Sequence, residues 1–330
     1  MGVDGGYTQK DVQEVARCLT SWTIDGPRRG GQFVFRDWMH DNGEKTVLGH
    51  KIPAGGGQKD GEMVIDILVH HPSTSKFIST ALVRRFVADT PPQSLVDRVS
   101  QAYIKTEGDI REMMRTILTS PEFNSPPAYR AKIKSPFELA ASAIRALGGD
   151  TNGSPALGQF ISKMGEPLYR YQAPTGYPDR AEQWVNTGAL LQRLNFGLAV
   201  SSNKIAGTTV AVGNSGGGSG QQLIDRAIGE LLGGDVSEET RTVLYKQMKE
   251  GVQVKGELTR DSSEAMEATT GEGFDSMTTQ APTKSKQERR ELKAERGWQL
   301  QASAQPAQPV NPETAKAFGL VLGSPEFQRR

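Results

Sequence analysis

Apolar residues recur at helical spacing through most of residues 60–200, and this periodicity constrains the fold more than any other feature. Prolines and glycines divide the stretch into consecutive segments of about helix length. The segment after Asp109 shows the pattern clearly, with an apolar face formed by Ile110, Met113, Met114, Ile117 and Leu118. The sequence therefore predicts a mainly α fold, a helical array with one small β-hairpin near the N-terminus.

Two capping boxes mark the start of predicted helices. Thr8 is followed three residues later by Asp11, and Ser135 is followed by Glu138. In such pairs the first side chain accepts a hydrogen bond from the backbone N–H of the second residue, whose carboxylate accepts one in return. Pro136 stands at the first helical position, where its fixed φ is favourable. Helices are therefore expected to begin after Thr8 and after Ser135.

The β-hairpin is predicted over residues 32–52. Aromatic and β-branched residues flank Asn42-Gly43, a pair typical of two-residue type I′ turns. The resulting register places two pairs of residues opposite each other, Trp38 with Val47 and Phe35 with His50.

Composition changes along the chain predict its organisation. Residues 1–205 are expected to form a main helical domain, followed by a Gly-rich loop at 206–220 and a helical pair at 221–250. Residues 251–310 hold few Leu, Ile, Val and Phe, which predicts a mobile insertion. Residues 311–330 are expected to form a C-terminal helix that docks on the main domain.

One short motif occurs twice. Residues 118–123 read Leu-Thr-Ser-Pro-Glu-Phe and residues 322–327 read Leu-Gly-Ser-Pro-Glu-Phe, each after an amphipathic segment. A duplicated helical unit would produce such an echo, but so would a recurring way of ending a helix. We favour the helix-ending interpretation because the similarity is confined to the motif.

Several classes of protein are disfavoured by composition. The 330 residues carry a net charge of +1, which argues against nucleic-acid binding through a basic surface. The single cysteine, Cys18, cannot form an internal disulfide and is expected to be buried. We recognise neither an apolar stretch long enough to cross a membrane nor a signal peptide.

The four histidines all lie in the first quarter of the chain, at His40, His50, His70 and His71. In the predicted hairpin register, His40 and His50 are about 16 Å apart on opposite faces, so they could not share a metal ion. His70 and His71 precede Pro72, where helix capping is ordinary. No metal site, cofactor or catalytic residue is assigned from these patterns.

Residues 165–178 combine three tyrosines, an arginine and several prolines and glycines, and Trp184 and Asn186 follow closely. Such a loop can bind sugars, peptides or partner surfaces. The alternative, which we favour at this level, is a proline-ordered loop packed over the helices by its own tyrosines.

Several segments in order resemble a large bacterial family catalogued as domain of unknown function 1800. The resemblance covers about residues 2–200 and resumes near the C-terminus. It is carried by residues 2–12, the Phe-x-Phe, His40-Asp41 and 45–49 region, and residues 71–74, 84–87, 134–138, 174–177, 184–186, 193–196 and 323–327.

The resemblance implies a mainly helical protein of a kind that is often exported and encoded beside a sulfatase-like family. Relatives carry a long helical N-terminal half ahead of the segment that matches residues 2–12. This chain is therefore expected to correspond to the C-terminal portion of a family member, and its own compartment is left open.

Three functions follow as hypotheses. The first is a non-enzymatic extracytoplasmic interaction or assembly protein of the cell surface, with a protein, a glycan or the nearby-encoded sulfatase-like protein as partner. The second is a hydrolase acting on a surface glycan or sulfated substrate, which requires His40, Asp41, His50 or His70 to converge in a pocket. The third is a truncated product without independent function.

Overall fold

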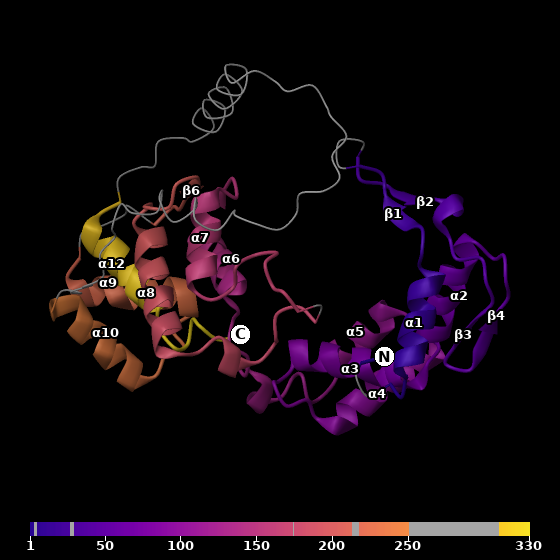
Figure 1. Ribbon diagram of the computed structural model, residues 1–330. Helices are drawn as coiled ribbons and strands as arrows, with labels where there is room; N and C mark the ends of the chain where they lie inside the picture. The colour runs from indigo at the N-terminus through magenta and orange to yellow at the C-terminus, as the bar shows by residue number, and fades with distance from the viewer. Residues whose placement is uncertain (3–4, 27–29, 174, 213–217, 251–309) are drawn as a thin grey trace, which may run out of the picture. The chain divides into compact units, whose positions relative to one another are not determined.

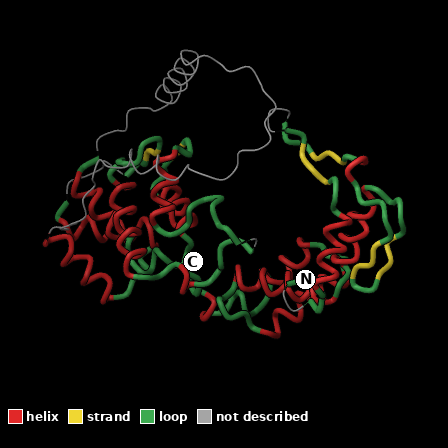
Figure 2. Tube along the Cα trace, viewed as in Figure 1, coloured by secondary structure: helices red, strands yellow, loops and turns green. Residues whose placement is uncertain are grey.

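The computed structural model describes residues 1–2, 5–26, 30–173, 175–212, 218–250 and 310–330 (Figure 1). These residues form eleven α-helices and three short two-stranded antiparallel sheets, so the mainly α prediction is confirmed (Figure 2). The chain divides into two compact units. Unit 1 comprises residues 1–133, 178–183 and 330, and unit 2 comprises residues 134–177 and 184–329.

Unit 1 contains five α-helices and two small sheets. The helices are α1 (Gln9–Cys18), α2 (Gln58–Val69), α3 (Pro72–Phe86), α4 (Gln93–Lys105) and α5 (Ile110–Leu118). The strands are β1 (Trp22–Ile24), β2 (Phe33–Phe35), β3 (Lys45–Val47) and β4 (His50–Ile52). The described residues of the unit also form three short 3₁₀ turns, η2 (Asp37–Met39), η3 (Pro126–Ala128) and η4 (Ala181–Gln183).

Both predicted capping boxes are confirmed. The Asp11 backbone N–H donates to the Thr8 hydroxyl and the Asp11 carboxylate accepts from the Thr8 N–H, which starts α1. Ser135 and Glu138 exchange the same two bonds at the start of α6 (Pro136–Ala146) in unit 2. The orphan N–H groups of the first helical turn are thereby satisfied locally, which is why the sequence alone located these two ends.

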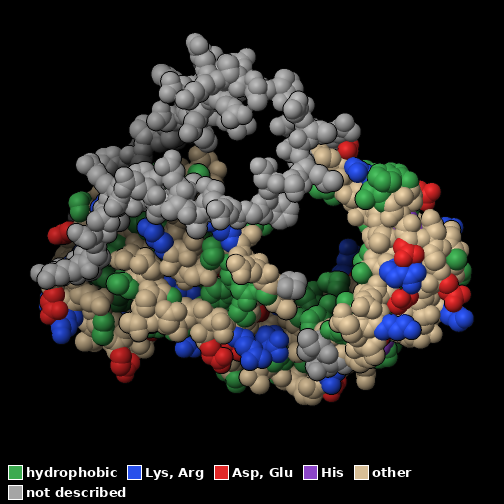
Figure 3. All heavy atoms as spheres, in the orientation of Figure 1, with side chains coloured by type: hydrophobic (Ala, Val, Ile, Leu, Met, Phe, Trp, Pro, Cys, Tyr) green, Lys and Arg blue, Asp and Glu red, His purple; other side chains and the backbone are tan. Residues whose placement is uncertain are grey.

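The predicted hairpin over residues 32–52 is wrong in its pairing. β2 pairs with β1 upstream, so Phe35 lies opposite Trp22 rather than His50. β3 pairs with β4, and Val47 lies opposite His50 rather than Trp38. Trp38 falls in η2 and is 81% exposed. In Figure 3, hydrophobic side chains gather at the surface of unit 1 beside β1 and β2.

The turn that organises β3 and β4 is Leu48-Gly49. Both residues have positive φ, +50° and +81°, as a two-residue type I′ turn requires. The Leu48 N–H donates to Asp11 Oδ1 at 2.7 Å, so α1 holds this turn in place. The Asn42-Gly43 segment instead forms a local turn in which the Gly43 N–H donates to Asp41 Oδ1. The hydrogen bond from Gly43 to the Asp41 side chain therefore stabilises a different backbone conformation from the expected hairpin turn.

Residues 178–183 belong to unit 1 through a buried ion-pair cluster. The Lys132 ammonium, 3% exposed, lies 2.5 Å from Asp89 Oδ1 and 3.1 Å from Asp179 Oδ1. The other Asp89 oxygen accepts from the Ala181 N–H at 2.8 Å. Because both carboxylates converge on one buried cation, the segment that carries Asp179 is attached to the helices of unit 1.

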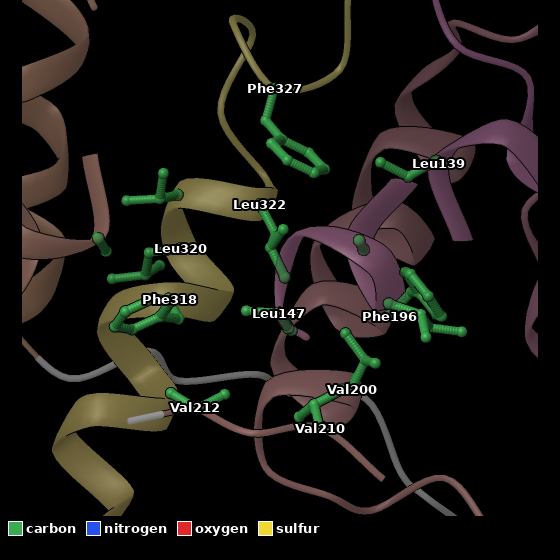
Figure 4. Close-up of a cluster of buried hydrophobic side chains, with 14 of the residues drawn as sticks. Leu139, Leu147, Phe196, Val200, Val210, Val212, Phe318, Leu320, Leu322 and Phe327 are labelled. Carbon is green, nitrogen blue, oxygen red and sulfur yellow. The ribbon is translucent and has the colours of Figure 1, made fainter. Parts of the chain in front are cut away.

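The described residues of unit 2 form six α-helices and one two-residue strand pair. Besides α6 they are α7 (Pro155–Lys163), α8 (Thr187–Ser201), α9 (Gly220–Leu232), α10 (Glu238–Glu250) and α12 (Pro312–Leu322). β5 (Asp150–Thr151) pairs with β6 (Thr208–Thr209). The core takes buried side chains from all six of these helices; Figure 4 shows part of it, including Leu139, Leu147, Phe196, Val200, Phe318, Leu322 and Phe327.

Helix α12 packs against α8 at two glycines. A Cβ atom on Gly197 would lie 2.8 Å from the Gly319 carbonyl oxygen, and a Cβ on Gly319 would lie 2.9 Å from the Leu198 Cα. The Ser201 hydroxyl donates to the Ala315 carbonyl oxygen across the same contact at 2.7 Å. The C-terminal helix is therefore docked through close backbone approach that any larger residue would prevent.

The predicted organisation maps onto these units as follows. Residues 1–205 span unit 1 and the first half of unit 2, and residues 221–250 carry nearly all of α9 and the whole of α10. The predicted insertion at 251–310 lies outside the described residues except for position 310, and the Gly-rich segment is described only in part. None of the described helices is both long and apolar enough to span a bilayer.

Candidate functional site

The four side chains required by the hydrolase hypothesis do not converge. His40 is buried, and its Nε2 atom lies 3.1 Å from Asp60 Oδ2. His50 is exposed at the start of β4. His70 is exposed at the end of α2, where its Nδ1 atom lies 2.8 Å from the Asp66 carbonyl oxygen. Among the described residues, no three His, Cys, Asp or Glu side chains are grouped so that they could hold a metal ion.

A buried charge cluster surrounds Asp60. The Lys45 Nζ atom lies 2.5 Å from Asp60 Oδ2, and the side chains of both residues and of His40 are at most 1% exposed. Lys45 also donates to the Asp41 carbonyl oxygen. Asp60 Oδ1 has no hydrogen-bond partner among the described residues. The cluster joins β3, η2 and α2, and its burial keeps a bound substrate away from the imidazole.

Hydrogen-bond geometry fixes the role of the His40 ring. Its Nδ1 atom lies 2.9 Å from the Thr20 carbonyl oxygen, an acceptor, so this nitrogen carries a hydrogen. The Thr20 hydroxyl, 3.1 Å from the same nitrogen, donates its own hydrogen to Arg17 O. The ring is thereby oriented with Nε2 toward Asp60 Oδ2, 3.1 Å away.

Asp41 is used to attach α1 to the strands. The Arg17 Nε atom lies 2.7 Å from Asp41 Oδ2, and this hydrogen bond lowers the pKa of Asp41 well below its usual value. The Glu14 carboxylate accepts from the Thr46 N–H at 3.1 Å. Hydrogen bonds from the Thr8 hydroxyl, the Thr8 N–H and the Leu48 N–H lower the pKa of Asp11 to about 2. The acidic face of α1 is therefore occupied by β3 and the turn that follows it.

Cys18 is fully buried, as expected, and burial raises the pKa of its thiol. The thiol form is therefore favoured over the thiolate that a nucleophile or a metal ligand requires.

Sequence reasoning did not single out Arg193 as a core residue. It is 2% exposed on α8; its Nη1 donates to Gln328 Oε1 at 2.7 Å and its Nη2 to the Lys134 carbonyl oxygen at 2.8 Å. Burial lowers the pKa of Arg193 to about 10, so the guanidinium remains charged at neutral pH. The available signal was its helical spacing from Phe196 and Val200, which places it on the buried face.

The aromatic loop of unit 2 has a packed inner layer. The Tyr177 hydroxyl donates to the Pro167 carbonyl oxygen at 2.7 Å, and the Tyr177 ring lies between Tyr171 and Trp184, with centroid separations of 4.5 and 5.9 Å. Burial raises the pKa of Tyr177. Trp184 is only 5% exposed. This part of the loop matches the favoured interpretation of a loop packed by its own tyrosines.

The outer layer of the same loop faces solvent. Tyr171 is 43% exposed although its ring contacts Tyr177. Tyr169 is fully exposed and has φ of +61°, a left-handed conformation that costs free energy for a residue with a Cβ. Residues 165–173 contain no helix or strand, and Figure 2 draws the start of the segment after α7 as loop. The loop therefore has a fixed base and presents two aromatic rings outward.

A shallow pocket of about 370 Å³ adjoins the base of this loop. We call it the α7–α8 pocket, and it is lined by Lys163, Met164, Gly165, Asn186, Gly188, Ala189 and Gln192. Gly165 is also the first residue of the loop, and Asn186 follows two residues after Trp184. The Asn186 Oδ1 atom accepts from the Ala189 N–H and caps α8. The pocket thus combines two amide side chains and one ammonium group.

Comparison with known proteins gives one informative match. No curated protein and no solved structure matches the chain. A family model described as "Protein of unknown function (DUF1800)" matches residues 1–329, which confirms the resemblance, and the chain therefore belongs to this family.

Proposed function

We propose that the protein is a non-enzymatic, extracytoplasmic interaction protein of the cell surface. The observation that carries the proposal is the aromatic loop, in which Tyr169 is fully exposed while Tyr171 is fixed against Tyr177. Large aromatic rings supply much contact area with few rotatable bonds, so they bind at a low cost in conformational entropy.

The fixed base of the loop strengthens this proposal. The hydrogen bond from Tyr177 to Pro167 and the ring contact with Trp184 hold the loop before any partner arrives. A preorganised surface loses less conformational entropy on binding than a mobile one. The positive φ of Tyr169 is a strained conformation that serves no packing role for its exposed ring, and strain of this kind concentrates at functional positions.

The proposal that the protein is not an enzyme rests on the contacts that its titratable side chains make. His40 and Lys45 both contact Asp60 in the interior of unit 1. Asp41 is paired with Arg17, and Lys132 with Asp89. These groups contribute to stability, and general acid–base chemistry requires a group within reach of substrate.

Sedimentation with cell envelopes tests the proposal. Full-length protein is mixed with envelopes from the source organism, and the bound fraction is compared for wild type, Tyr169→Ala/Tyr171→Ala and Tyr129→Ala. Tyr129, 65% exposed in unit 1, is the matched control. We expect binding by wild type and by the control, and at least tenfold weaker binding by the double variant. Equal binding by all three proteins would contradict the proposal. Recovery of the protein only in the cytoplasmic fraction, after fractionation of the cells that produce it, would contradict it as well.

A hydrolase acting on a surface glycan or sulfated substrate is the second candidate. It is favoured by one observation, the hydrogen bond between His40 and Asp60, because a carboxylate that orients an imidazole is a common general-base arrangement. It requires an opening of unit 1 that exposes His40. Turnover of aryl sulfates or aryl glycosides that His40→Gln abolishes, with the fold retained, would establish this candidate in place of the first.

A further inference from the structure

We propose that the α7–α8 pocket and the rings of Tyr169 and Tyr171 together bind an uncharged polysaccharide. The inference rests on the proposed interaction function and adds the chemical class of the ligand. It is carried by the exposed aromatic rings and by a pocket that includes Gly165, four residues before Tyr169 in the chain, and is lined by two amide-bearing residues.

The aromatic rings match one face of a sugar. A pyranose ring presents several C–H groups on one side, and these carry a small positive charge that is attracted to the negative face of an aromatic ring. Tyr171 is suited to this role because Tyr177 supports one side of its ring and leaves the residue 43% exposed. Tyr169, two residues away and fully exposed, extends the surface beyond a single sugar.

The pocket matches the hydroxyl groups of a sugar. Asn186 and Gln192 carry amides, each with donor and acceptor groups, and Lys163 adds a donor. Adjacent sugar hydroxyls need both kinds of partner at short spacing. Gly165 and Gly188 leave part of the wall without side chains, and the volume of about 370 Å³ is at the lower end for small-ligand sites.

Other ligand classes fit less well. A phosphate or sulfate group is usually recognised by several cations, most often a cluster of arginines, whereas the pocket lining contains the single cation Lys163. An apolar ligand would cover the Gln192 amide and the Asn186 amide nitrogen without offering them hydrogen bonds, at a cost in binding free energy. Hydroxyl-rich, uncharged chains satisfy both the rings and the amides.

The pocket and the rings can be altered separately. Gly188 lies in the first turn of α8, and a Cβ atom there would meet only Asn186 Oδ1, at an ordinary 3.5 Å. Gly188→Met therefore adds a side chain to the pocket wall without a clash at Cβ. Tyr171→Ala removes a ring, whereas Tyr171→Phe keeps the ring and its support on Tyr177.

Affinity electrophoresis of the full chain in native gels provides the test. The gels contain laminarin, hydroxyethylcellulose, soluble starch or galactomannan as uncharged polymers, and alginate or dextran sulfate as acidic ones. We expect retardation by at least one uncharged polymer, weakened at least tenfold by Tyr171→Ala and by Gly188→Met. Tyr171→Phe and the control Tyr129→Ala are expected to migrate as wild type does. Circular dichroism melts verify that each variant is folded.

The outcomes separate this inference from the function on which it rests. Retardation only by acidic polymers, or retardation that both Tyr171→Ala and Gly188→Met leave unchanged, overturns the sugar site. If no uncharged polymer retards the protein while Tyr169→Ala/Tyr171→Ala still releases it from envelopes, the sugar class is wrong and the interaction function stands. If neither binding is observed, both proposals fail.

Discussion

The imidazole of His40 and the carboxylate of Asp60 are hydrogen-bonded inside unit 1, with Nε2 and Oδ2 3.1 Å apart and neither side chain more than 1% exposed. Asp60 also faces the Lys45 ammonium, so one carboxylate contacts two buried side chains. Removing one member of a buried charge cluster leaves the others without compensation, which costs far more than an exposed ion pair contributes.

Asp60→Asn is therefore expected to destabilise unit 1 by about 3–5 kcal/mol, because the Lys45 charge loses its buried counter-charge. Urea unfolding monitored by circular dichroism measures the change. Asp66→Asn, an exposed substitution on the same helix, is the control and should shift the midpoint little. A shift for Asp60→Asn no larger than that of the control would show that the cluster does not hold this unit together.

Gly56→Ala should destabilise the same region. A Cβ atom on Gly56 would lie 2.0 Å from Asp60 Oδ1, so the carboxylate would have to move away from its partners. We expect a loss of about 1–3 kcal/mol, as for other overpacked positions. Gly26, where a Cβ would meet nothing within 4 Å, supplies the matched Gly→Ala control. Equal unfolding midpoints for the two variants would refute the proposed crowding.

Acid should weaken the attachment of α1 to the Leu48-Gly49 turn. Hydrogen bonds lower the pKa of Asp11 to about 2 from 3.8, so its ionised form favours the folded state. This contribution is fully present above pH 3.8 and is lost as the pH falls toward 2. In thermal melts between pH 2 and 6, Asp11→Asn should flatten the acid limb. Glu182→Gln, an exposed control substitution, should leave the acid dependence of the melting temperature unchanged. If the melting temperatures of both variants fall equally steeply with acid, Asp11 does not contribute as described.

Arg193→Lys should loosen the segment after α12. A lysine ammonium cannot donate to both Gln328 Oε1 and the Lys134 carbonyl oxygen as the planar guanidinium does. Losing one hydrogen bond that involves a charged group lowers the free energy of unfolding by about 1.5–3 kcal/mol. Hydrogen exchange should increase in residues 324–329 with little change in unit 1. Unaltered exchange in that segment would mean that Arg193 does not anchor it.

Local signals were read correctly from the sequence. The two Ser-Pro-Glu-Phe motifs end their helices through the same bonds: the N–H of Phe123 donates to the Ser120 hydroxyl, and that of Phe327 donates to the Ser324 hydroxyl. The next side chain, Asn124 or Gln328, donates to the carbonyl oxygen of the last helical leucine. All these partners lie within six residues, so the predicted helix-ending role was accessible to sequence reasoning.

Long-range relationships were not accessible. The Asn42-Gly43 pair is a strong hairpin signal, but the Arg17–Asp41 ion pair, between residues 24 positions apart, holds that segment in a different turn. Asp60 stands in the first turn of α2, where an acidic residue is ordinary by sequence. Its pairing with His40 and Lys45 depends on tertiary contacts that no local pattern encodes. The same holds for the pocket beside the aromatic loop.

The burial of Cys18 has a practical consequence. It is the single cysteine of the chain and is fully inaccessible to solvent, so maleimide dyes should react slowly with the native protein. A cysteine introduced by Tyr169→Cys would then be labelled almost exclusively, without any prior removal of native thiols. The fluorescence of a dye at position 169 would report ligand binding to the aromatic loop in real time. The rate at which Cys18 becomes labelled would report how fast unit 1 unfolds in the same sample.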